Sequence, residues 1–505
     1  MADDTAGRSR EDEVLRARRG SLERLGDRAF ALSLAAALGV DEPIATSDLR
    51  TRFSDLPPDH REDERVTVAG RIVLLRDMGK LRFLTLRDGA GDLQLVCDRR
   101  ELDDEAWTLL DEVDLGDIVG ATGRIGTTRR GELSVFVERW AMLTKSLRPL
   151  PEKWHGLKDP DLQQRRRYLH LIADDAPRRY VAGRAAVLRA LRETLHARGF
   201  VEIEGPILQT VAGGANARPF TTFHEALGID TKLRISLELY LKRLLVGGIE
   251  RVYELGRNFR NEGIDRDHNP EFTMLEAYQA YGDYHTMMEL TEDLVRNSAR
   301  AVADVTGRDD ALTIPWRGST IDLSASFRRL ALLEAVSEVA GETIALDRPD
   351  LRDVASRLDV AVDDGAGPGA IVLEIYEKRV EGTLVQPTFV MDYPREVSPL
   401  ARPHRSDAAL TEHFDLVMGG VEMVTAFSEL TDPIEQRAKF ELQAQLEATG
   451  EEPHPLDEDF LRALEHGMPP AGGLGLGVDR LLMILTDAPS LRDLIMFPTH
   501  RPEAD

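Results

Sequence analysis

The chain has 505 residues, of which 42% are apolar and 30% are charged, and its formal net charge is −25. This length and composition are typical of a globular protein with two or three domains and well-buried cores. The acidic balance argues against indiscriminate nucleic-acid binding, because a polyanion is repelled except where basic side chains cluster. No apolar run is long enough to span a bilayer, and the N-terminus MADDTAGRSREDEV lacks a signal peptide, so we expect a cytoplasmic protein without a membrane segment.

Cys97 is the single cysteine, which excludes an internal disulfide and any metal site built from several cysteines. It lies in a strand-like run, and we expect it to be buried. Contact with RNA would have to be local, at clusters of arginine. Each cluster taken singly is most simply a solvated face. The clusters are Arg16 to Arg19, Arg129-Arg130, Arg165 to Arg167 and Arg178-Arg179.

Residues 1–63 are expected to form a helical extension and a connector. Apolar side chains spaced among arginines and acids predict a weakly amphipathic surface helix over residues 7–25, interrupted by Gly20. The remainder, up to residue 63, is rich in Asp, Pro and Arg, which is typical of a connector.

From residue 64 to 145 the pattern changes to short strands. Three strand-like runs, VTVAGRIVLLR, LRFLTLRD and DLQLVCD, precede a helical run from Glu101 to Val113 and two further strands. This order matches a five-stranded OB-fold barrel, a shape used on single-stranded nucleic acid. The alternative is a generic small barrel without a ligand.

Residues 146–178 carry several prolines and a basic end, which predicts a hinge before a second domain over residues 179–505. That domain opens with a helix from Arg179 to Arg198, which Gly199 ends, and with a strand FVEIEGPIL. Residues 283–380 have a mostly helical pattern and no visible chemistry. We interpret them as an insertion packed on the sheet of this domain.

A long antiparallel hairpin is expected from Arg251 to Tyr281, with a charged loop between its strands. The loop holds more hydrogen-bonding side chains than a turn needs. Its arginines suit phosphate or carboxylate, its acids could read an exocyclic amine, and Phe272 offers a flat surface for a base. These features predict a nucleotide site, and the alternative is a solvated hairpin with surface ion pairs. The polar residues are Arg260, Glu262, Arg266, His268, Asn269 and Glu271.

A second hairpin, HFDLVMGGVEMVTAFSEL, should turn near residues 419–420. Asp415 and Glu422 share a face there and would repel unless a cation lay between them, so Mg²⁺ carried in with nucleotide phosphates is the natural occupant. Two solvated acids on an edge hairpin are the alternative. Three further polar or aromatic residues expected at the site would face the opposite side of a regular strand from Glu422, so a β-bulge is expected between Glu422 and Thr425. These residues are Thr425, Phe427 and Glu429.

Residues 472–485, GGLGLGVDRLLMIL, predict a glycine-rich strand that leads into an amphipathic helix beginning near Val478 or Asp479. The glycines would let a phosphate or adenine lie against the backbone, and Arg480 in the first turn would face an anion. Gly213-Gly214 provides a second flexible backbone that can approach a small ligand.

Two segments of the first hairpin resemble motif 2 of the class II aminoacyl-tRNA synthetases, in the form found in lysyl-tRNA synthetases. These segments are FRNEG and HNPEFTMLE. The predicted helix from Arg179 to Arg198 and the strand FVEIEGPIL after it, with Pro206, resemble motif 1, which forms the dimer in that family. Residues 472–485 resemble motif 3. The resemblance covers about residues 66–500. It implies an α+β homodimer, with an N-terminal OB-fold anticodon-binding domain and a C-terminal class II antiparallel sheet with flanking helices. The implied activity is lysyl-tRNA synthesis from L-lysine, ATP and lysine tRNA, with Mg²⁺.

The resemblance also implies residue roles. Arg260 would bridge the amino-acid carboxylate and the α-phosphate, and Arg480 would bind the γ-phosphate, so these two are the catalytic candidates. Further ATP contacts would be Glu262, His268, Asn269 and Phe272. Lysine contacts would be Gly214, Glu238, Arg260, Glu276, Tyr278, Thr425, Phe427 and Glu429, with the ε-ammonium on Tyr278 and Glu429. The metal ligands would be Asp415 and Glu422.

In the barrel the resemblance implies contacts with the middle anticodon base from Arg76, Phe83, Gln94 and Glu132. Three competing functions are open. An aspartyl or asparaginyl relative would need a cation where Tyr278 and Glu429 stand, and a paralogue could lysylate another acceptor. A non-catalytic RNA-binding regulator is the third, whereas a lysyl-lipid synthase would require membrane spans.

Overall fold

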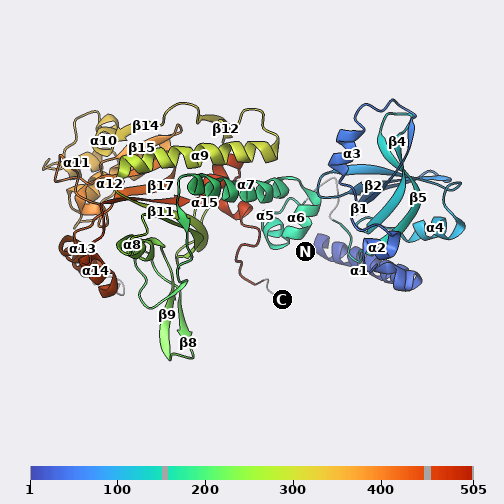
Figure 1. Cartoon of the computed structure of the whole chain (residues 1–505), viewed down its shortest axis with the longest axis horizontal. Helices are drawn as coiled ribbons and strands as arrows, with labels where there is room; N and C mark the ends of the chain where they lie inside the picture. The colour runs from blue at the N-terminus through green and yellow to red at the C-terminus, as the bar shows by residue number, and fades with distance from the viewer. Residues whose placement is uncertain (1, 151–156, 216, 448–455, 503–505) are drawn as a thin grey trace. The chain divides into compact units, whose positions relative to one another are not determined.

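The structure is a computed structural model that describes residues 2–150, 157–215, 217–447 and 456–502. The chain divides into two compact units, which we call the barrel unit (Met1–Lys158) and the sheet unit (Asp159–Asp505). Figure 1 gives their elements in chain order. None of the helices in the described residues combines the length and the apolarity that crossing a bilayer requires.

The barrel unit contains a closed barrel with strand order β1-β2-β3-β5-β4, which confirms the predicted five-stranded barrel. Alternate residues point inward, so Leu84, Leu86, Leu93 and Leu95 pack in its core. Cys97 is buried there as expected, and burial raises the pKa of its thiol to about 12. The elements are β1 (Arg61–Asp77), β2 (Leu81–Arg87), β3 (Asp92–Asp98), α4 (Asp104–Leu109), η2 (Leu110–Glu112), β4 (Ile118–Thr127) and β5 (Leu133–Thr144).

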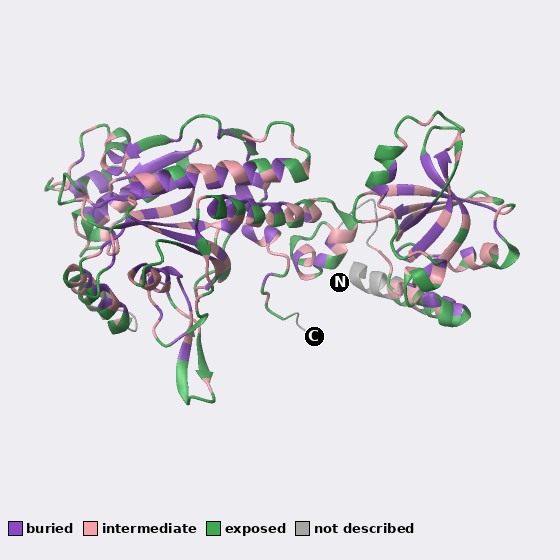
Figure 2. Ribbon diagram, viewed as in Figure 1, coloured by how far each residue is buried: buried purple, intermediate pink, exposed green. Residues whose placement is uncertain are grey.

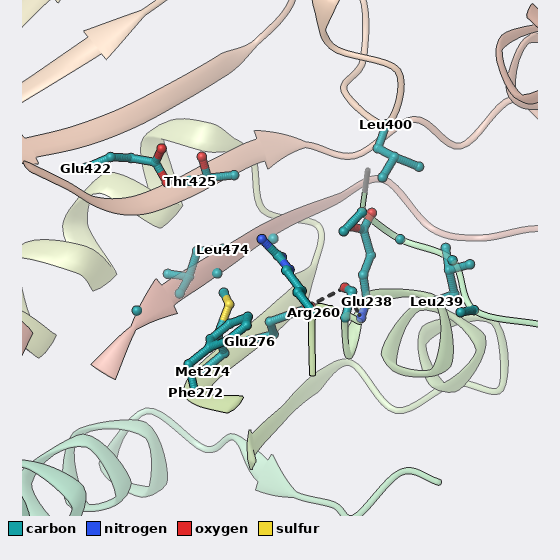
Figure 3. Close-up of a pocket in the computed structure, with 18 of the residues that line it drawn as sticks. Glu238, Leu239, Arg260, Phe272, Met274, Glu276, Leu400, Glu422, Thr425 and Leu474 are labelled. Atoms are coloured by element: carbon teal, nitrogen blue, oxygen red, sulfur yellow. Dashed lines mark hydrogen bonds between the residues drawn. The ribbon is translucent and has the colours of Figure 1, made fainter. Parts of the chain in front are cut away.

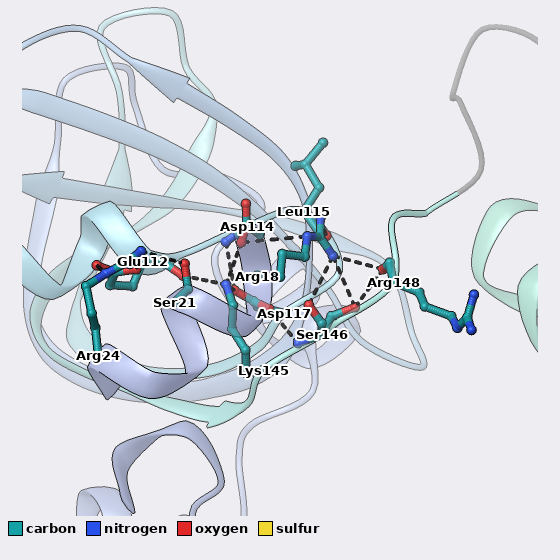
Figure 4. A network of polar contacts seen from close by, with 10 residues as sticks. All are labelled: Arg18, Ser21, Arg24, Glu112, Asp114, Leu115, Asp117, Lys145, Ser146 and Arg148. Carbon is teal, nitrogen blue, oxygen red and sulfur yellow. Dashed lines mark hydrogen bonds and ion pairs between the residues drawn. The ribbon is translucent and has the colours of Figure 1, made fainter. Parts of the chain in front are cut away.

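The N-terminal extension packs against this barrel (Figure 4). Arg18 is 6% exposed and donates to the carbonyl oxygens of Leu115 at 2.9 Å and Arg148 at 2.8 Å. One member of the first arginine cluster is therefore a structural anchor. The first helix runs through Gly20, so the expected interruption was wrong, because packing outweighs a glycine cost of about 1 kcal/mol. The elements are α1 (Ala2–Leu25), η1 (Gly26–Ala29), α2 (Leu34–Leu38) and α3 (Thr46–Arg52).

The sheet unit is built on an eight-stranded sheet with strand order β14-β15-β16-β17-β18-β11-β10-β6. Neighbours are antiparallel except for β6 with β10 and β14 with β15. The predicted hairpins are both present. The strands are β6 (Val201–Glu202), β10 (Arg251–Phe259), β11 (Glu271–Ala280), β14 (Arg328–Ala331), β15 (Thr388–Met391), β16 (His413–Met418), β17 (Val421–Ser428) and β18 (Ala471–Gly477).

The run FVEIEGPIL does not form one strand, contrary to expectation. Only Val201–Glu202 joins the large sheet, and β7 (Leu208–Gln209) pairs instead in a three-stranded sheet, β7-β9-β8. Pro206 has no N–H for a continuous ladder, and the Glu254 carboxylate accepts the N–H of Gly205 at 2.9 Å. The other two strands of this small sheet are β8 (Thr221–His224) and β9 (Ile229–Leu233).

Helices cover the sheet from two sides, and Figure 2 shows the buried stripe along the strands between them. Leu191, Leu294 and Leu482, from α7, α9 and α15, pack in one core with Leu275 of β11. Leu241 of α8 and Phe460 of α14 pack in a separate cluster. These helices are α7 (Ala176–Ala197), α8 (Glu238–Val246), α9 (Tyr284–Thr306), α14 (Glu458–Glu465) and α15 (Val478–Thr486).

Residues 283–380 contain several helices, but they also contain strands, and β14 forms one end of the large sheet. The remaining elements of the unit are α5 (Pro160–Arg165), α6 (Arg167–Ala173), β12 (Thr313–Trp316), β13 (Ser319–Asp322), α10 (Leu332–Ala340), α11 (Leu351–Arg357), α12 (Pro368–Arg379), η3 (Glu381–Thr383), η4 (Arg395–Val397), α13 (Pro433–Glu447) and α16 (Leu491–Leu494).

Candidate active site

β11 separates the core from a large cavity. Its side chains alternate, so Leu275 and Ala277 are wholly buried under the helices, whereas every second residue from Phe272 onward faces the other side. That side is a cavity of about 590 Å³. The face spans about 20 Å, at roughly 3.3 Å per residue. The residues along it are Phe272, Met274, Glu276 and Tyr278.

The glycine-rich strand β18 forms the next part of this surface. Gly473 pairs with Tyr278 and Gly475 pairs with Glu276 in the β-ladder. A Cβ atom at Gly473 would collide with the Glu429 carboxylate and the Tyr278 ring. This glycine therefore makes room for two protein side chains.

The second hairpin turns at Gly419 and Gly420, as predicted. Its register shifts between the pairs Leu416 with Val424 and Val417 with Glu422, so Met423 is an extra residue. This is the bulge that the parity of the sequence predicts. It confirms that Glu422 and Thr425 can both face the cavity.

Asp415 lies beside this cavity and does not line it. Its Oδ1 atom accepts the hydroxyl of Thr425 and lies 3.1 Å from Nε2 of His413. Burial raises the pKa of Asp415, but the charge of His413 and these hydrogen bonds outweigh that effect, so the pKa lies below its ordinary value. For Glu422, burial and then the negative charge of Asp415 raise the pKa.

Asp415 and Glu422 are the two carboxylates predicted to hold a metal ion. No group of three or more His, Cys, Asp or Glu side chains in the described part of the chain is placed to hold a metal ion. Their chemistry suits magnesium, which usually takes one or two protein carboxylates and completes its shell with phosphates and water, and Glu422 is the one of the two that lines the cavity. Arg480 occupies one side of Glu422, with Nη1 3.6 Å from its carboxylate and 2.9 Å from its carbonyl oxygen.

Two of the predicted nucleotide residues, Arg260 and Phe272, lie side by side in the cavity (Figure 3). The Arg260 guanidinium lies 5.1 Å from the centre of the Phe272 ring, and its Nε donates to the carbonyl of Ile235 at 3.4 Å. Burial lowers the pKa of Arg260. His268 lies 3.1 Å from Nη2 of Arg480, so the loop of the first hairpin meets the helix after β18. Glu262 and Asn269 also line the cavity.

The other end of the cavity is acidic. Glu276 accepts hydrogen bonds from the Leu237 N–H at 3.0 Å, the Ser236 hydroxyl at 3.1 Å and the Tyr278 hydroxyl at 3.1 Å. Burial, and then the charge of Glu238, raises the pKa of Glu276 to about 7. Burial also raises the pKa of Glu429 to about 8.

All predicted ATP and lysine residues line this one cavity. Asp415 does not, and neither do Arg266 and Glu271, the two remaining polar residues of the first hairpin that were expected at the nucleotide site. Sequence reasoning missed Lys242, which is wholly buried and forms ion pairs with Glu238 and Glu429. Its spacing of four residues from Glu238 on a helix was a usable signal. At Gly214 the backbone φ is +86°, which favours glycine.

In the barrel unit three of the predicted anticodon residues, Arg76, Phe83 and Gln94, share one face of the strands. Arg76 pairs with Phe83 across β1 and β2. Gln94 of β3 pairs with Thr85, two residues after Phe83, so it lies on the same face as Phe83, because side chains alternate between the two faces of a strand. Gln94 donates to the Ser134 hydroxyl at 2.9 Å, and that hydroxyl donates to the carbonyl of Glu132 at 3.0 Å. Phe83 is half-buried and lies outside the barrel core.

Two family models match the chain in the regions of the two units. Residues 159–501 match the model described as tRNA synthetases class II (D, K and N), and residues 66–143 match an OB-fold nucleic acid binding domain. The chain is therefore a class II tRNA synthetase with an OB-fold domain.

Similar proteins show which family within the class II synthetases the chain belongs to. The chain is 48% identical to the lysine–tRNA ligase of Gloeobacter violaceus, over 90% of this chain and 92% of the relative. It is also 48% identical to that of Moorella thermoacetica, over 91% and 93%, and 44% identical to that of a Thermoanaerobacter species, over 98% and 97%. The chain belongs to the lysine–tRNA ligase family.

Proposed function

We propose that this chain activates L-lysine with ATP and transfers it to lysine tRNA. A lysine carboxylate oxygen attacks the α-phosphorus, the bond to pyrophosphate breaks, and lysyl-adenylate forms. The terminal ribose hydroxyl of the tRNA then attacks the lysyl carbonyl, AMP leaves, and the hydroxyl proton is lost. Catalysis needs positioning and charge neutralisation and no side-chain nucleophile.

The observation that carries the proposal is the order of side chains along β11. Phe272 offers a stacking surface beside Arg260, and Glu276 and Tyr278 follow toward the acidic end. A base, a phosphate and an ammonium group can therefore bind in that order along a face of about 20 Å. Arg260 would hold the lysine carboxylate against the α-phosphate, with the ε-ammonium at Tyr278 and Glu429.

The remaining ATP contacts would come from the loop of the first hairpin and from Arg480. The adenine would stack on Phe272 beside Glu262, with His268 and Asn269 near the phosphates. Magnesium would be held by Glu422 and Asp415 and would supply charge neutralisation for the phosphates. Gly214, Glu238, Thr425 and Phe427 would complete the lysine pocket.

The barrel would read the anticodon of lysine tRNA. Phe83 would stack on the middle base, and polar groups around it would bind the base edge. Exposed arginine supports local attraction of RNA on an acidic protein, and Arg76 lies on the same face as Phe83. The other polar groups would be Gln94 and Glu132.

A second copy of the chain would cover the edge of the sheet unit. Apolar side chains are exposed around β6 and on the small sheet that projects from the unit in Figure 1. Exposed apolar side chains of this kind mark an interaction surface. Sedimentation should show a dimer that Phe223→Glu weakens, and a wild-type monomer would contradict this proposal. The side chains are Val201, Ile207, Leu208, Phe223, Leu227 and Ile229.

The test of the proposed reaction is lysine-dependent exchange of pyrophosphate into ATP. Wild-type protein should exchange only with lysine and Mg²⁺ present. Arg480→Ala should raise the KM for ATP far more than that for lysine, because the arginine lies at the nucleotide end beside Glu422 and His268. An equal loss for both substrates would contradict the role of Arg480.

A further inference from the structure

A lysine lies behind the acidic end of the cavity. Lys242 on α8 is 0% exposed and does not line the cavity, yet its ammonium group contacts Glu238 and lies 2.5 Å from Oε2 of Glu429. Glu238 lies one helical turn before it, whereas Glu429 follows β17. The ammonium group therefore holds Glu238 within α8 and ties α8 to Glu429 after β17, and both of these carboxylates line the cavity.

Burying an ammonium group is costly unless opposite charges compensate it. The charges at this end do more than compensate Lys242. Glu238, Glu276 and Glu429 are three buried carboxylates, and Lys242 supplies one positive charge among them. When all four groups are ionised, two negative charges are left over. Free lysine carries two ammonium groups, and its carboxylate would face Arg260.

We propose that Lys242 is a positioning residue that sets the charge of the lysine pocket: it holds Glu238 and Glu429 in place and cancels one of three carboxylate charges. The two remaining charges match the two ammonium groups of the substrate. This inference rests on the proposed function. Because Lys242 does not line the cavity, it acts on the substrate through the two carboxylates that it contacts.

The proposal predicts a displaced pH dependence when Lys242 is lost. Burial raises the pKa of Glu429 to about 8, and the charge of Lys242 opposes this rise. An ammonium substrate needs the ionised carboxylate, so lysine binding should strengthen as the pH rises through about 8. Without Lys242 the pKa rises further, and the gain in binding moves to higher pH. The groups around Glu429 are Lys242 and Glu238 of α8, Glu276 and Tyr278 of β11, and Gly473 of β18, with Lys439 of α13 near Lys242.

The test is lysine-dependent pyrophosphate exchange by full-length Lys242→Ala protein. This variant lacks three carbons and an ammonium group, which is the shape of propylammonium. At about pH 7 we expect the KM for lysine to rise about tenfold or more, with little change in the KM for ATP. Propylammonium should restore much of the loss, whereas 1-propanol, which has a similar shape and no charge, should not.

Two variants serve as controls. Lys242→Met fills the space without a charge, so it should show the raised KM and the displaced pH profile but no rescue by propylammonium. Lys145→Met removes another wholly buried lysine, which forms ion pairs with Asp114 and Asp117 in the barrel unit (Figure 4). It should lower the melting temperature and keep the wild-type lysine KM and pH profile.

The proposal is overturned if propanol and propylammonium restore Lys242→Ala equally, because packing alone would then explain the residue. A wild-type lysine KM and pH profile in both Lys242 variants would also overturn it. If Lys242→Ala does not fold, the pH profile of Lys242→Met decides, and failure of both to fold assigns Lys242 to stability alone and rejects the proposal. Absence of lysine-dependent exchange in wild-type protein would instead reject the proposed function.

Discussion

Glu429 lies at the acidic end of the cavity with its side chain wholly buried. Glu429→Gln removes the charge proposed to face the ε-ammonium. The loss of one partner of a buried charge pair costs about 2 to 5 kcal/mol, so the KM for lysine should rise by tens- to thousands-fold. The KM for ATP should stay near its wild-type value. Pyrophosphate exchange with each substrate varied in turn measures both.

The matched control is Glu271→Gln, at the start of β11, where the carboxylate is half-exposed and pairs with Arg257 at 3.1 Å. Ion pairs at such exposed sites contribute about 1 kcal/mol or less, so this variant should behave as wild type. A wild-type dependence on lysine in Glu429→Gln would place Glu429 outside the lysine pocket.

Most of the predicted residues that line the cavity were found from the sequence, because they lie in the two hairpins and the glycine-rich strand, which are recognisable as local motifs. The buried cations were not predictable in the same way. Lys242 is held by Glu429, and wholly buried Arg167 donates to the carbonyl of Arg492 at 3.0 Å, so both depend on partners far along the chain. A basic run such as Arg165 to Arg167 looks like a solvated face until those partners are known.

Two glycines of strand β18 differ in what an added methyl group would meet. Gly473→Ala should impair lysine binding strongly, because the new methyl group would meet the Glu429 carboxylate and the Tyr278 ring. Gly475→Ala should cost less, because its methyl group would lie 3.1 Å from the flexible end of Met274. Lysine KM and melting temperature, measured for both variants, test this order. A larger loss of lysine binding in Gly475→Ala would contradict it.

The alternation of side chains along a strand made the bulge in β17 predictable from the sequence. The parity of Glu422 and Thr425 required a bulge, and the register shift at Met423 provides it. The interruption of the strand within residues 201–209 was not predicted, because it involves a partner on another strand. That partner is the Glu254 carboxylate of β10, which accepts the Gly205 N–H.

At the scale of the whole molecule, the two units should separate by function. Phe83→Ala removes the proposed stacking surface for an anticodon base, and such a stack contributes roughly 1 to 3 kcal/mol. Charging of tRNA should fall while pyrophosphate exchange stays near normal. Both reactions and the melting temperature should be measured on the same preparation.

The control for this variant is Leu84→Ala, the next residue, which is 2% exposed in the barrel core. It should lower the melting temperature of the barrel, because core truncations of leucine cost about 2 to 5 kcal/mol. If Phe83→Ala lost stability in the same way without a specific defect in charging, Phe83 would be a packing residue.

Lysine activation by the sheet unit is the central claim, and pyrophosphate exchange with each of the twenty amino acids tests it most directly. The acidic end of the cavity, with Glu276 and Glu429 beside Tyr278, should accept a cationic side chain and reject an anionic one. We expect Mg²⁺-dependent exchange with lysine and little with the other nineteen. Equal exchange with aspartate or asparagine, or none with lysine, would contradict the account.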